Sequence, residues 1–426
     1  MADIADIVRR REKLLGPNNP LFYEDPVHLV RGEGVWVYDA DGRRYLDCYN
    51  NVPTVGHCHP HVVEALCRQA GTLNTHTRYL HEGILDYGER LLAMVDDSIS
   101  NIALTCTGSE ANDVAMRMAR AVTGKAGFIC TNATYHGNTT AVTQMSSIFE
   151  PMGGYGPHIR HVPFPDSYRP IDGKSGAKLA AAYADTVRDA IEDLERSGQG
   201  FAGFLICPIF ANEGLPDIPR GYLREAVGHV RASGGLFIAD EVQSAFGRTG
   251  RMFGHDPDEA VPDIITLGKP MGNGHPLAGV LARPECMAAF RNQEMYFNTF
   301  GGNPVSCAVG MAVLDVLENE GLVENAATTG AYLLKRLGEL KERHALIGDV
   351  RGRGLFFGIE MVSDREARTP APEETDRIVN AMRHAGILLS RIGAHGNVLK
   401  IRPPLPFHRE HADLLVAALN EVLATP

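Results

Sequence analysis

The stretch DIITLGKPMGNGHPLAG, residues 263–279, carries an apolar run into a loop rich in glycine and proline, with Lys269 at the junction. Similar short apolar runs recur in FAGFLICP (201–208) and GGLFIADE (234–241). Continuous runs without a polar side are typical of strands in a parallel sheet that is covered on both faces. Unlike arginine, lysine can lose its proton and attack a carbonyl, so its place at a strand end suggests a chemical role. A single lysine taken alone is more often a solvated surface charge.

The apolar runs alternate with amphipathic segments, and this alternation indicates an α/β fold. Residues 220–234 have the pattern of a helix between two such runs. In residues 109–122, Val114, Met118 and Val122 are spaced along one helical stripe, which predicts a helix with that stripe buried.

Two domains are predicted. The large domain covers residues 55–310 and has a mostly parallel central sheet covered by helices. From about residue 310 the pattern changes to long helical segments followed by strand-like stretches, which predicts a smaller α+β domain over residues 311–426. Residues 1–54 are expected to join the small domain, and within them the dipeptide Asp41-Gly42 predicts a hairpin.

Composition narrows the class of protein. The chain has 426 residues, 44% hydrophobic residues and a formal net charge of -11, which argues against nucleic acid or anionic membranes as partners. No apolar run has transmembrane length, and the first residues lack the apolar core of a signal peptide. Eight cysteines are scattered without a C-x-x-C pair, so we expect free thiols in the cytoplasm.

A histidine-rich turn, GHCHPH (56–61), raises the alternative of a metal site. A zinc site of this kind would need a distant second pair of ligands, and none is evident. The sequence therefore favours a structural turn before a helix, and no metal is predicted.

Three further positions could carry chemistry at the carboxyl edge of the sheet, where ligands bind in open α/β folds. Gly108 and Ser109 open a helix and could present backbone N–H groups and a hydroxyl to an anion, or could form an ordinary helix start. Asp240 and Glu241 end a buried strand and could bind a metal, act as acid and base, hold a cation or cap a helix. Lys269, if buried at this edge, would be a nucleophile near neutral pH.

Together these features match the attachments that pyridoxal 5'-phosphate requires. An anion cradle would hold its phosphate, a carboxylate would keep its pyridine nitrogen protonated, and a lysine would form the Schiff base. Tyr135 adds an aromatic side chain that could stack on the ring.

Five motifs then follow one another along the chain: TGSEAND (107–113), YHG (135–137), ADEVQSAFGRTG (239–250), LGKPMGNGHPLAG (267–279) and FNTFGGNPVSCAVG (297–310). In this order they resemble the motifs of the class III aminotransferases, which are pyridoxal-phosphate enzymes of fold type I. The resemblance extends over nearly the whole chain.

This resemblance implies a role for each matching residue. Lys269 would be the Schiff-base lysine and the general acid–base, and Asp240 would pair with the pyridine nitrogen. Gly108 and Ser109 would bind the phosphate, and Tyr135 would stack on the ring with His136 beside it. Gln243 would approach the ring's phenolic oxygen. Thr299 would contact the phosphate of a neighbouring subunit, and Arg402 would bind a substrate carboxylate. The role of Thr299 implies an obligate homodimer with shared active sites, or a tetramer built from such dimers.

A narrower resemblance is to the branch that holds the mitochondrial type of alanine–glyoxylate aminotransferase and the ethanolamine-phosphate phospho-lyases. Many class III aminotransferases carry an EPxQGE-like segment, whose last Glu can pair with the carboxylate-binding arginine. Here Cys207 stands at the first Glu and Asn212 at the last, while Glu213 follows one position later. This departure weakens the aminotransferase interpretation. Arg402 supports it, because the phospho-lyase pattern is expected to have a lysine at that position.

The sequence therefore predicts an aminotransferase that moves an amino group from an amino acid or amine to a keto acid. The alternative is a phospho-lyase that releases phosphate and ammonia from phosphoethanolamine or a similar amine. A racemase on the same scaffold and a cofactor-binding protein without turnover remain further alternatives.

Overall fold

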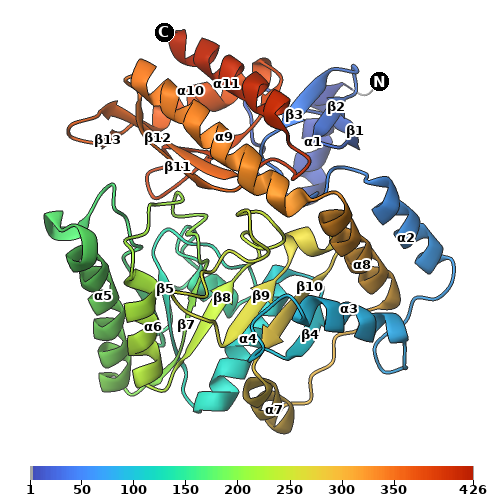
Figure 1. Ribbon diagram of the computed structural model, residues 1–426, viewed down its shortest axis with the longest axis vertical. Coiled ribbons are helices and arrows are strands. Elements are labelled where there is room, and N and C mark those ends of the chain that lie inside the picture. The colour runs from blue at the N-terminus through green and yellow to red at the C-terminus, as the bar shows by residue number, and fades with distance from the viewer. Residues whose placement is uncertain (1–2, 426) are drawn as a thin grey trace.

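The computed structural model describes residues 3–425, which form a large lobe and a smaller one (Figure 1). The large lobe contains a seven-stranded sheet in the order β4-β10-β9-β8-β7-β5-β6. Strand β10 runs antiparallel to both of its neighbours, and the other pairs are parallel. The mostly parallel sheet predicted from the sequence is confirmed. Its strands are β4 (Asn101–Thr105), β5 (Gly127–Thr131), β6 (Ile159–Val162), β7 (Phe201–Ile206), β8 (Leu236–Asp240), β9 (Ile264–Leu267) and β10 (Ala278–Ala282).

Helices cover both faces of this sheet, which explains the continuous apolar runs. Along β5, Phe128 and Cys130 belong to the apolar cluster formed with α4, whereas Ile129 belongs to the cluster that includes α5 and α6. Val114 and Met118 of α4 are buried as expected, but Val122 is 38% exposed because it lies in the last turn, beyond the edge of the sheet. The helices of this lobe are α2 (Pro60–Ala70), α3 (Glu82–Leu92), α4 (Gly108–Thr123), α5 (Gly176–Arg196), α6 (Tyr222–Ala232), α7 (Pro284–Gln293) and α8 (Pro304–Asn319).

The small lobe is an antiparallel sheet, order β11-β12-β16-β15, packed against three helices. Its short strand β13 pairs with β12 alone. The elements are β11 (Ile347–Arg353), β12 (Phe356–Asp364), β13 (Thr369–Pro370), β15 (Ser390–Ile392), β16 (Val398–Ile401), α9 (Leu322–Arg343), α10 (Pro372–His384) and α11 (Arg409–Ala424).

The N-terminal segment lies against this small lobe (Figure 1). After α1 (Ile4–Leu15) come β1 (Leu29–Glu33), β2 (Trp36–Asp39) and β3 (Arg44–Asp47), and β3 pairs in parallel with β14 (Ile387–Leu388). Strands β2 and β3 form the predicted hairpin, with Gly42 at φ +84°. The domain boundaries at residues 54 and 310 stay predictions; helix α8 runs across the second without a break.

The histidines of the turn at residues 56–61 each face a different carboxylate. His57 Nε2 lies 2.7 Å from Asp47, His59 Nε2 lies 2.9 Å from Glu320, and His61 Nε2 lies 3.0 Å from Asp315. Within residues 3–425 no group of three or more His, Cys, Asp or Glu side chains is arranged to hold a metal ion. Across the same residues, no helix combines the length and apolar character needed to cross a bilayer.

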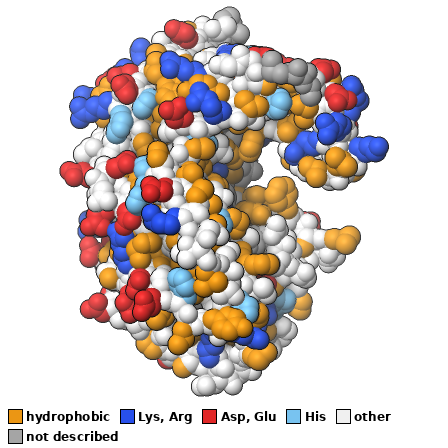
Figure 2. Space-filling model, turned by 90° about the vertical axis from the view of Figure 1, so that its right-hand side faces the viewer, with side chains coloured by type: hydrophobic (Ala, Val, Ile, Leu, Met, Phe, Trp, Pro, Cys, Tyr) orange, Lys and Arg blue, Asp and Glu red, His pale blue; other side chains and the backbone are white. Residues whose placement is uncertain are grey.

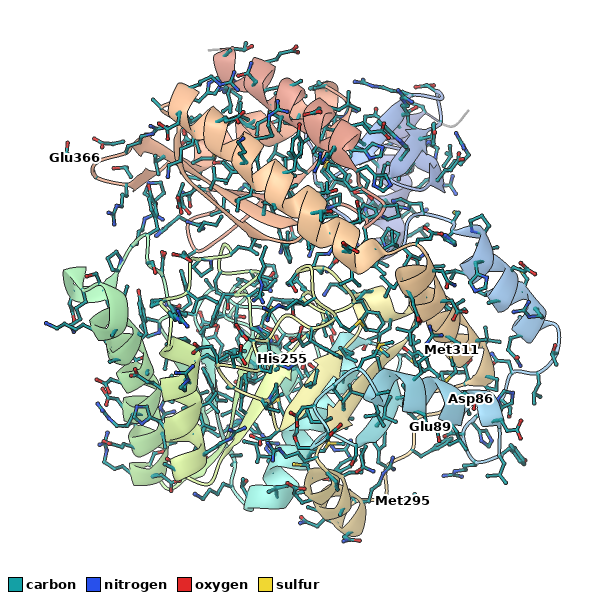
Figure 3. All side chains as sticks on the ribbon, viewed as in Figure 1. Asp86, Glu89, His255, Met295, Met311 and Glu366 are labelled. Carbon is teal, nitrogen blue, oxygen red and sulfur yellow. The ribbon has the colours of Figure 1, made fainter. Side chains whose placement is uncertain are left out.

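In the view of Figure 2 a hollow opens at the right-hand edge of the molecule, and hydrophobic side chains lie along its lower rim. Tyr79 and Leu80 just before α3 and Leu85 within it are exposed, as are Met295 and Phe300 of the loop after α7. Met295 projects beside α7 at the edge of the molecule (Figure 3).

Candidate active site

The predicted site residues from four parts of the chain meet in one small cavity at the carboxyl ends of the parallel strands. The cavity has a volume of about 110 Å³. It receives residues from the start of α4, from the loop after β5, and from the ends of β7, β8 and β9. Its lining residues are Gly108, Ser109, Tyr135, His136, Gly137, Cys207, Asp240, Val242, Gln243 and Lys269.

The anion cradle is the N-terminus of the 16-residue helix α4. Thr107 caps it, since its side chain accepts from the Glu110 N–H at 3.2 Å while the Glu110 carboxylate accepts from the Thr107 N–H at 3.1 Å. This capping box leaves the N–H groups of Gly108 and Ser109 available to an anion, at the positive end of the helix dipole. A Cβ on Gly108 would lie 2.9 Å from Val242 Cγ2, so only glycine allows this close approach.

Asp240 is a buried carboxylate held by three donors. Asn112 Nδ2 lies 2.9 Å from its Oδ2, His136 Nδ1 lies 2.6 Å from the same oxygen, and the Val242 N–H donates to Oδ1 at 3.0 Å. Burial by itself would raise the pKa of Asp240, but the hydrogen bonds from His136, Asn112 and the Val242 backbone bring it below its ordinary value. The carboxylate is therefore kept ionised and can hold a protonated ring nitrogen.

Lys269 stands at the first position of a short 3₁₀ turn, Lys269–Gly272, directly after β9. The turn is anchored by Asn273, which accepts from the Val55 N–H at 3.0 Å and donates to the Gly56 carbonyl at 2.9 Å. Burial, and next the charge of Arg402, lower the pKa of Lys269. The glycine- and proline-rich loop thus places a readily deprotonated amine inside the cavity.

Glu241, the neighbour of Asp240, has a structural role. Its carboxylate accepts from the backbone N–H groups of Gly254 and His255, both at 2.8 Å, and from Ser244 Oγ at 2.5 Å. The His255 ring, near the centre of the large lobe in Figure 3, also lies 2.8 Å from it. Glu241 therefore organises the loop after β8 and does not reach the cavity.

A second polar cluster adjoins the cavity through Gln243. Its Nε2 donates to Asn212 Oδ1 at 3.2 Å, and its Oε1 accepts from Arg402 Nη1 and, at 3.3 Å, from Lys400 Nζ. Arg402 does not line the cavity itself. Glu213 forms no ion pair with Arg402 here, because its carboxylate accepts from Thr131 Oγ1 at 2.6 Å and from the Asn212 N–H at 3.0 Å.

Thr299 lies outside the cavity of its own chain. It is exposed in the loop between α7 and α8, next to Asn298, whose Oδ1 accepts from the Phe300 and Gly301 N–H groups at 3.1 Å and 2.9 Å. The loop is thus ordered and presents Thr299 outward.

Pyridoxal phosphate fits this donor set. The cavity joins a helix N-terminus for a phosphate, an ionised buried carboxylate for a pyridinium and a buried amine for an aldehyde. Tyr135 and Val242 supply the aromatic and apolar surface for a ring.

Comparison with known proteins agrees with this chemistry. Residues 23–423 match the family described as Aminotransferase class-III. The chain belongs to the class III aminotransferases. It is therefore a pyridoxal-phosphate-dependent enzyme of fold type I, as the motifs implied.

Several relatives are similar over most of their length. The protein named alanine–glyoxylate aminotransferase 2 homolog 2, mitochondrial, from Arabidopsis thaliana is 41% identical, and the match covers 97% of this chain and 86% of that protein. A phospholyase from Arthrobacter, solved in complex with phosphoethanolamine, is 44% identical with a TM-score of 0.96, covering 99% of this chain and 100% of that one. An amine transaminase from an uncultivated Pseudomonas species, solved with pyridoxal phosphate bound, is 30% identical with a TM-score of 0.87, covering 94% and 95%.

Two site residues escaped the sequence analysis. Asn112 directs its Nδ2 to Asp240 because its Oδ1 accepts from Thr266 Oγ1 at 2.7 Å. The sequence feature that could have revealed Asn112 is that it is a polar residue on the buried face of the helix that starts at the anion cradle. Lys400, in β16, could have been found because it lies two positions before Arg402, and alternate side chains of an extended segment share a face.

Proposed function

We propose that this class III enzyme transfers an amino group from an amine with an acidic group to a keto acid, with the chemistry at Lys269. The observation that carries this proposal is the placement of a buried amine with a lowered pKa in the same cavity as an ionised buried carboxylate, Asp240. Such pairs with opposed roles are typical of catalytic sites.

Pyridoxal phosphate, when bound, supplies an aldehyde that accepts the amino group and a ring that withdraws electrons from the carbon bearing it. The chain's own residues supply the rest. The α4 N–H groups of Gly108 and Ser109 hold the phosphate, and Asp240 keeps the ring nitrogen protonated. Lys269, whose burial lowers its pKa and so favours the neutral amine, removes the proton from the substrate carbon and returns it elsewhere in the reaction. Arg402 would bind the acidic group of the donor and of the keto acid in turn.

We further propose a homodimer with shared active sites. The hydrophobic side chains of Tyr79, Leu80, Leu85, Met295 and Phe300 are exposed, and a groove of about 380 Å³ with mostly apolar walls lies between α3 and the loop after α7. Exposed apolar surface of this kind is typical of an interface between subunits. The outward position of Thr299 in the same loop fits contact with the phosphate site of a second copy.

A second candidate is the phospho-lyase reaction. It is supported by the similarity to the Arthrobacter phospholyase and by the second cation, Lys400, beside Arg402. In that reaction the carbanion formed by loss of a proton to Lys269 expels phosphate, and no keto acid is needed.

The test uses purified protein loaded with pyridoxal phosphate and a panel of amines without a keto acid. Cofactor absorbance, ammonia and inorganic phosphate are followed together. Consumption of one equivalent of amine with bleaching and no ammonia supports the aminotransferase, and product then accumulates only after a keto acid is added. Continued release of ammonia while the absorbance persists contradicts it, and phosphate from phosphoethanolamine would identify the lyase.

We also propose a reducing cellular compartment, the cytoplasm, as the place of action. The support is the set of eight unpaired cysteines, of which Cys48, Cys130, Cys207, Cys286 and Cys307 are buried. Detection of the native protein in fractionated cells tests this, and recovery in an organelle fraction would contradict it.

A further inference from the structure

Two cations beside the cavity have no anionic partner. Lys400 of β16 is 2% exposed, and Arg402, two residues further on, is 7% exposed. Neither forms an ion pair with any residue between 3 and 425. Burying an uncompensated charge is costly, and proteins normally pair such groups.

The partners of both cations are neutral oxygens. Lys400 Nζ lies 3.3 Å from Asn212 Oδ1 and 3.3 Å from Gln243 Oε1. Arg402 Nη1 donates to the same Gln243 oxygen, and its Nε donates to the Tyr49 carbonyl at 2.7 Å. One amide oxygen therefore occupies the position between two basic side chains where an anionic oxygen would bind more strongly.

The two carboxylates whose charges act on these side chains, Asp47 on Arg402 and Glu213 on Lys400, form no ion pair with them. The Asp47 carboxylate lies 2.7 Å from His57 Nε2. Glu213 is directed at Thr131 and at the Asn212 N–H, and burial raises its pKa, which favours its neutral form. For Lys400, burial and then the charges of Arg402 and Lys269 lower the pKa well below its ordinary value, which favours the neutral amine until a negative charge is added beside it.

Aromatic rings lie beside both basic side chains. The Phe356 ring centroid lies 5.4 Å from Lys400 Nζ, and the Tyr49 ring centroid lies 4.6 Å from Arg402 Cζ. Aromatic walls lower the local dielectric, so an anion bound here is attracted more strongly than at a wet surface.

We propose that Lys400 is a specificity-determining residue that acts with Arg402 as a two-cation clamp and selects amines whose acidic group carries two negative charges, a phosphate monoester or phosphonate. This inference rests on the proposed function, since the amine must react at Lys269 while its acid lies in the clamp. A carboxylate or sulfonate supplies one negative charge, which suffices for Arg402 alone, whereas a second negative charge also stabilises the ammonium form of Lys400. The compact ammonium of Lys400, with three donors, suits the oxygens of a tetrahedral acid, and Arg402 adds a planar fork.

The experiment compares two amines of the same shape and different charge. 2-Aminoethylphosphonate is close to a dianion at pH 8, whereas taurine carries a single sulfonate charge. The phosphonate has no phosphate leaving group, so neither compound reports elimination. Dissociation constants are measured from the immediate change in cofactor absorbance of the loaded enzyme, for the wild type and for Lys400→Gln and Lys400→Arg. Propylamine, which has no acidic group, is the reference ligand.

We expect the wild type to bind the phosphonate at least tenfold more tightly than taurine. Lys400→Gln, which keeps hydrogen-bonding capacity toward Asn212 and Gln243, should abolish that ratio while propylamine binding stays within twofold. Lys400→Arg should restore most of the preference for the phosphonate over taurine. Equal loss for all three ligands, or a ratio that survives Lys400→Gln, overturns the proposal.

Two safeguards keep the result interpretable. If the variants do not fold, the wild-type ratio alone decides, since a value near one contradicts the clamp. Binding is read without turnover, so an enzyme that selects the phosphonate but transfers no amino group would refute the proposed reaction and leave the clamp intact. Turnover without charge selectivity would refute the clamp and leave the proposed reaction intact.

Discussion

The imidazole Nδ1 of His136 lies 2.6 Å from Oδ2 of Asp240, and both residues are buried at the wall of the cavity. The same oxygen accepts from Asn112, so the carboxylate is oriented from two sides before any ligand binds. This arrangement keeps Asp240 charged in a place where burial alone would neutralise it. The folded protein therefore supplies the negative charge of the cofactor site before the cofactor binds.

Replacing that charge tests its role directly. Asp240→Asn keeps the shape but removes the anion that would hold a ring nitrogen in its protonated form. We expect kcat to fall about 10²- to 10³-fold, the order seen when one electrostatic contact to a reacting centre is lost. Steady-state kinetics with the fold checked by circular dichroism would measure this.

A matched control removes a buried carboxylate elsewhere in the same sheet. Asp263, just before β9, accepts from the Phe237 N–H at 2.9 Å and pairs with Arg283 at 3.0 Å. Asp263→Asn should lower the melting temperature while kcat stays within threefold. A similar loss of kcat in both variants would mean that Asp240 acts through folding alone.

Lys269 predicts a pH-dependent change in stability. Because its pKa is lowered on folding, the buried ammonium destabilises the folded protein at pH values below the folded pKa. As the pH rises from that value toward 10.5, the ordinary value, the folded state loses its proton first and the penalty disappears. Lys269→Met should therefore raise the free energy of unfolding of the cofactor-free protein at pH 7, and the gain should shrink as the pH approaches 10.

Urea unfolding of cofactor-free wild type and variant across this pH range measures the difference. Activity should be absent from the variant at every pH. A gain in stability that grows with pH would contradict the assigned burial of the amine, and normal activity would refute the assignment of the site.

Most of the fold could be predicted because the sheet is covered on both faces. Its strands, such as 201–208 and 234–241, are then continuous apolar runs that no surface strand would carry. The hairpin at Gly42 was equally predictable, since its positive φ favours glycine. The exposure of Val122 was not, because helical spacing does not reveal where a helix passes the edge of the sheet.

The site was predictable only where a motif fixes a backbone shape. Gly108, Asp240 and Lys269 each lie at a strand end or helix start, which sequence patterns reveal. The pairing of Asn112 with Asp240 and of Lys400 with Gln243 depends on contacts between residues more than a hundred positions apart. No local pattern encodes such contacts, so their roles needed the structure.

Gly108 gives a prediction about cofactor affinity. In Gly108→Ala the new Cβ would lie 2.9 Å from Val242 Cγ2, and Val242 would have to move within the cavity. Overpacking of this kind costs about 1–3 kcal/mol, so we expect pyridoxal phosphate to bind roughly 10- to 100-fold more weakly. Equilibrium dialysis of the cofactor would show it.

Gly228, within α6, is the matched control because a Cβ there meets no atom within 4 Å. Gly228→Ala should leave cofactor affinity unchanged and stabilise the protein by about 0.5–1 kcal/mol through helix propensity. Unchanged affinity in Gly108→Ala would show that the close contact with Val242 is not needed for the cradle.

The proposed dimer makes the last prediction. Leu80 is fully exposed two residues before α3, which lines the apolar groove, and a second copy seated on that groove would cover it. Leu80→Asp places a charge in that interface, and burying an unpaired carboxylate is costly. We expect sedimentation velocity to show a shift from dimer to monomer at micromolar concentration, together with weaker binding of pyridoxal phosphate, because Thr299 of the second copy would no longer reach the phosphate.

Leu414→Asp on α11, at a leucine that is 49% exposed, serves as the control and should remain dimeric. A wild type that sediments as a monomer, or a Leu80→Asp variant that dimerises as well as Leu414→Asp, would place the interface elsewhere and leave the role of Thr299 without support.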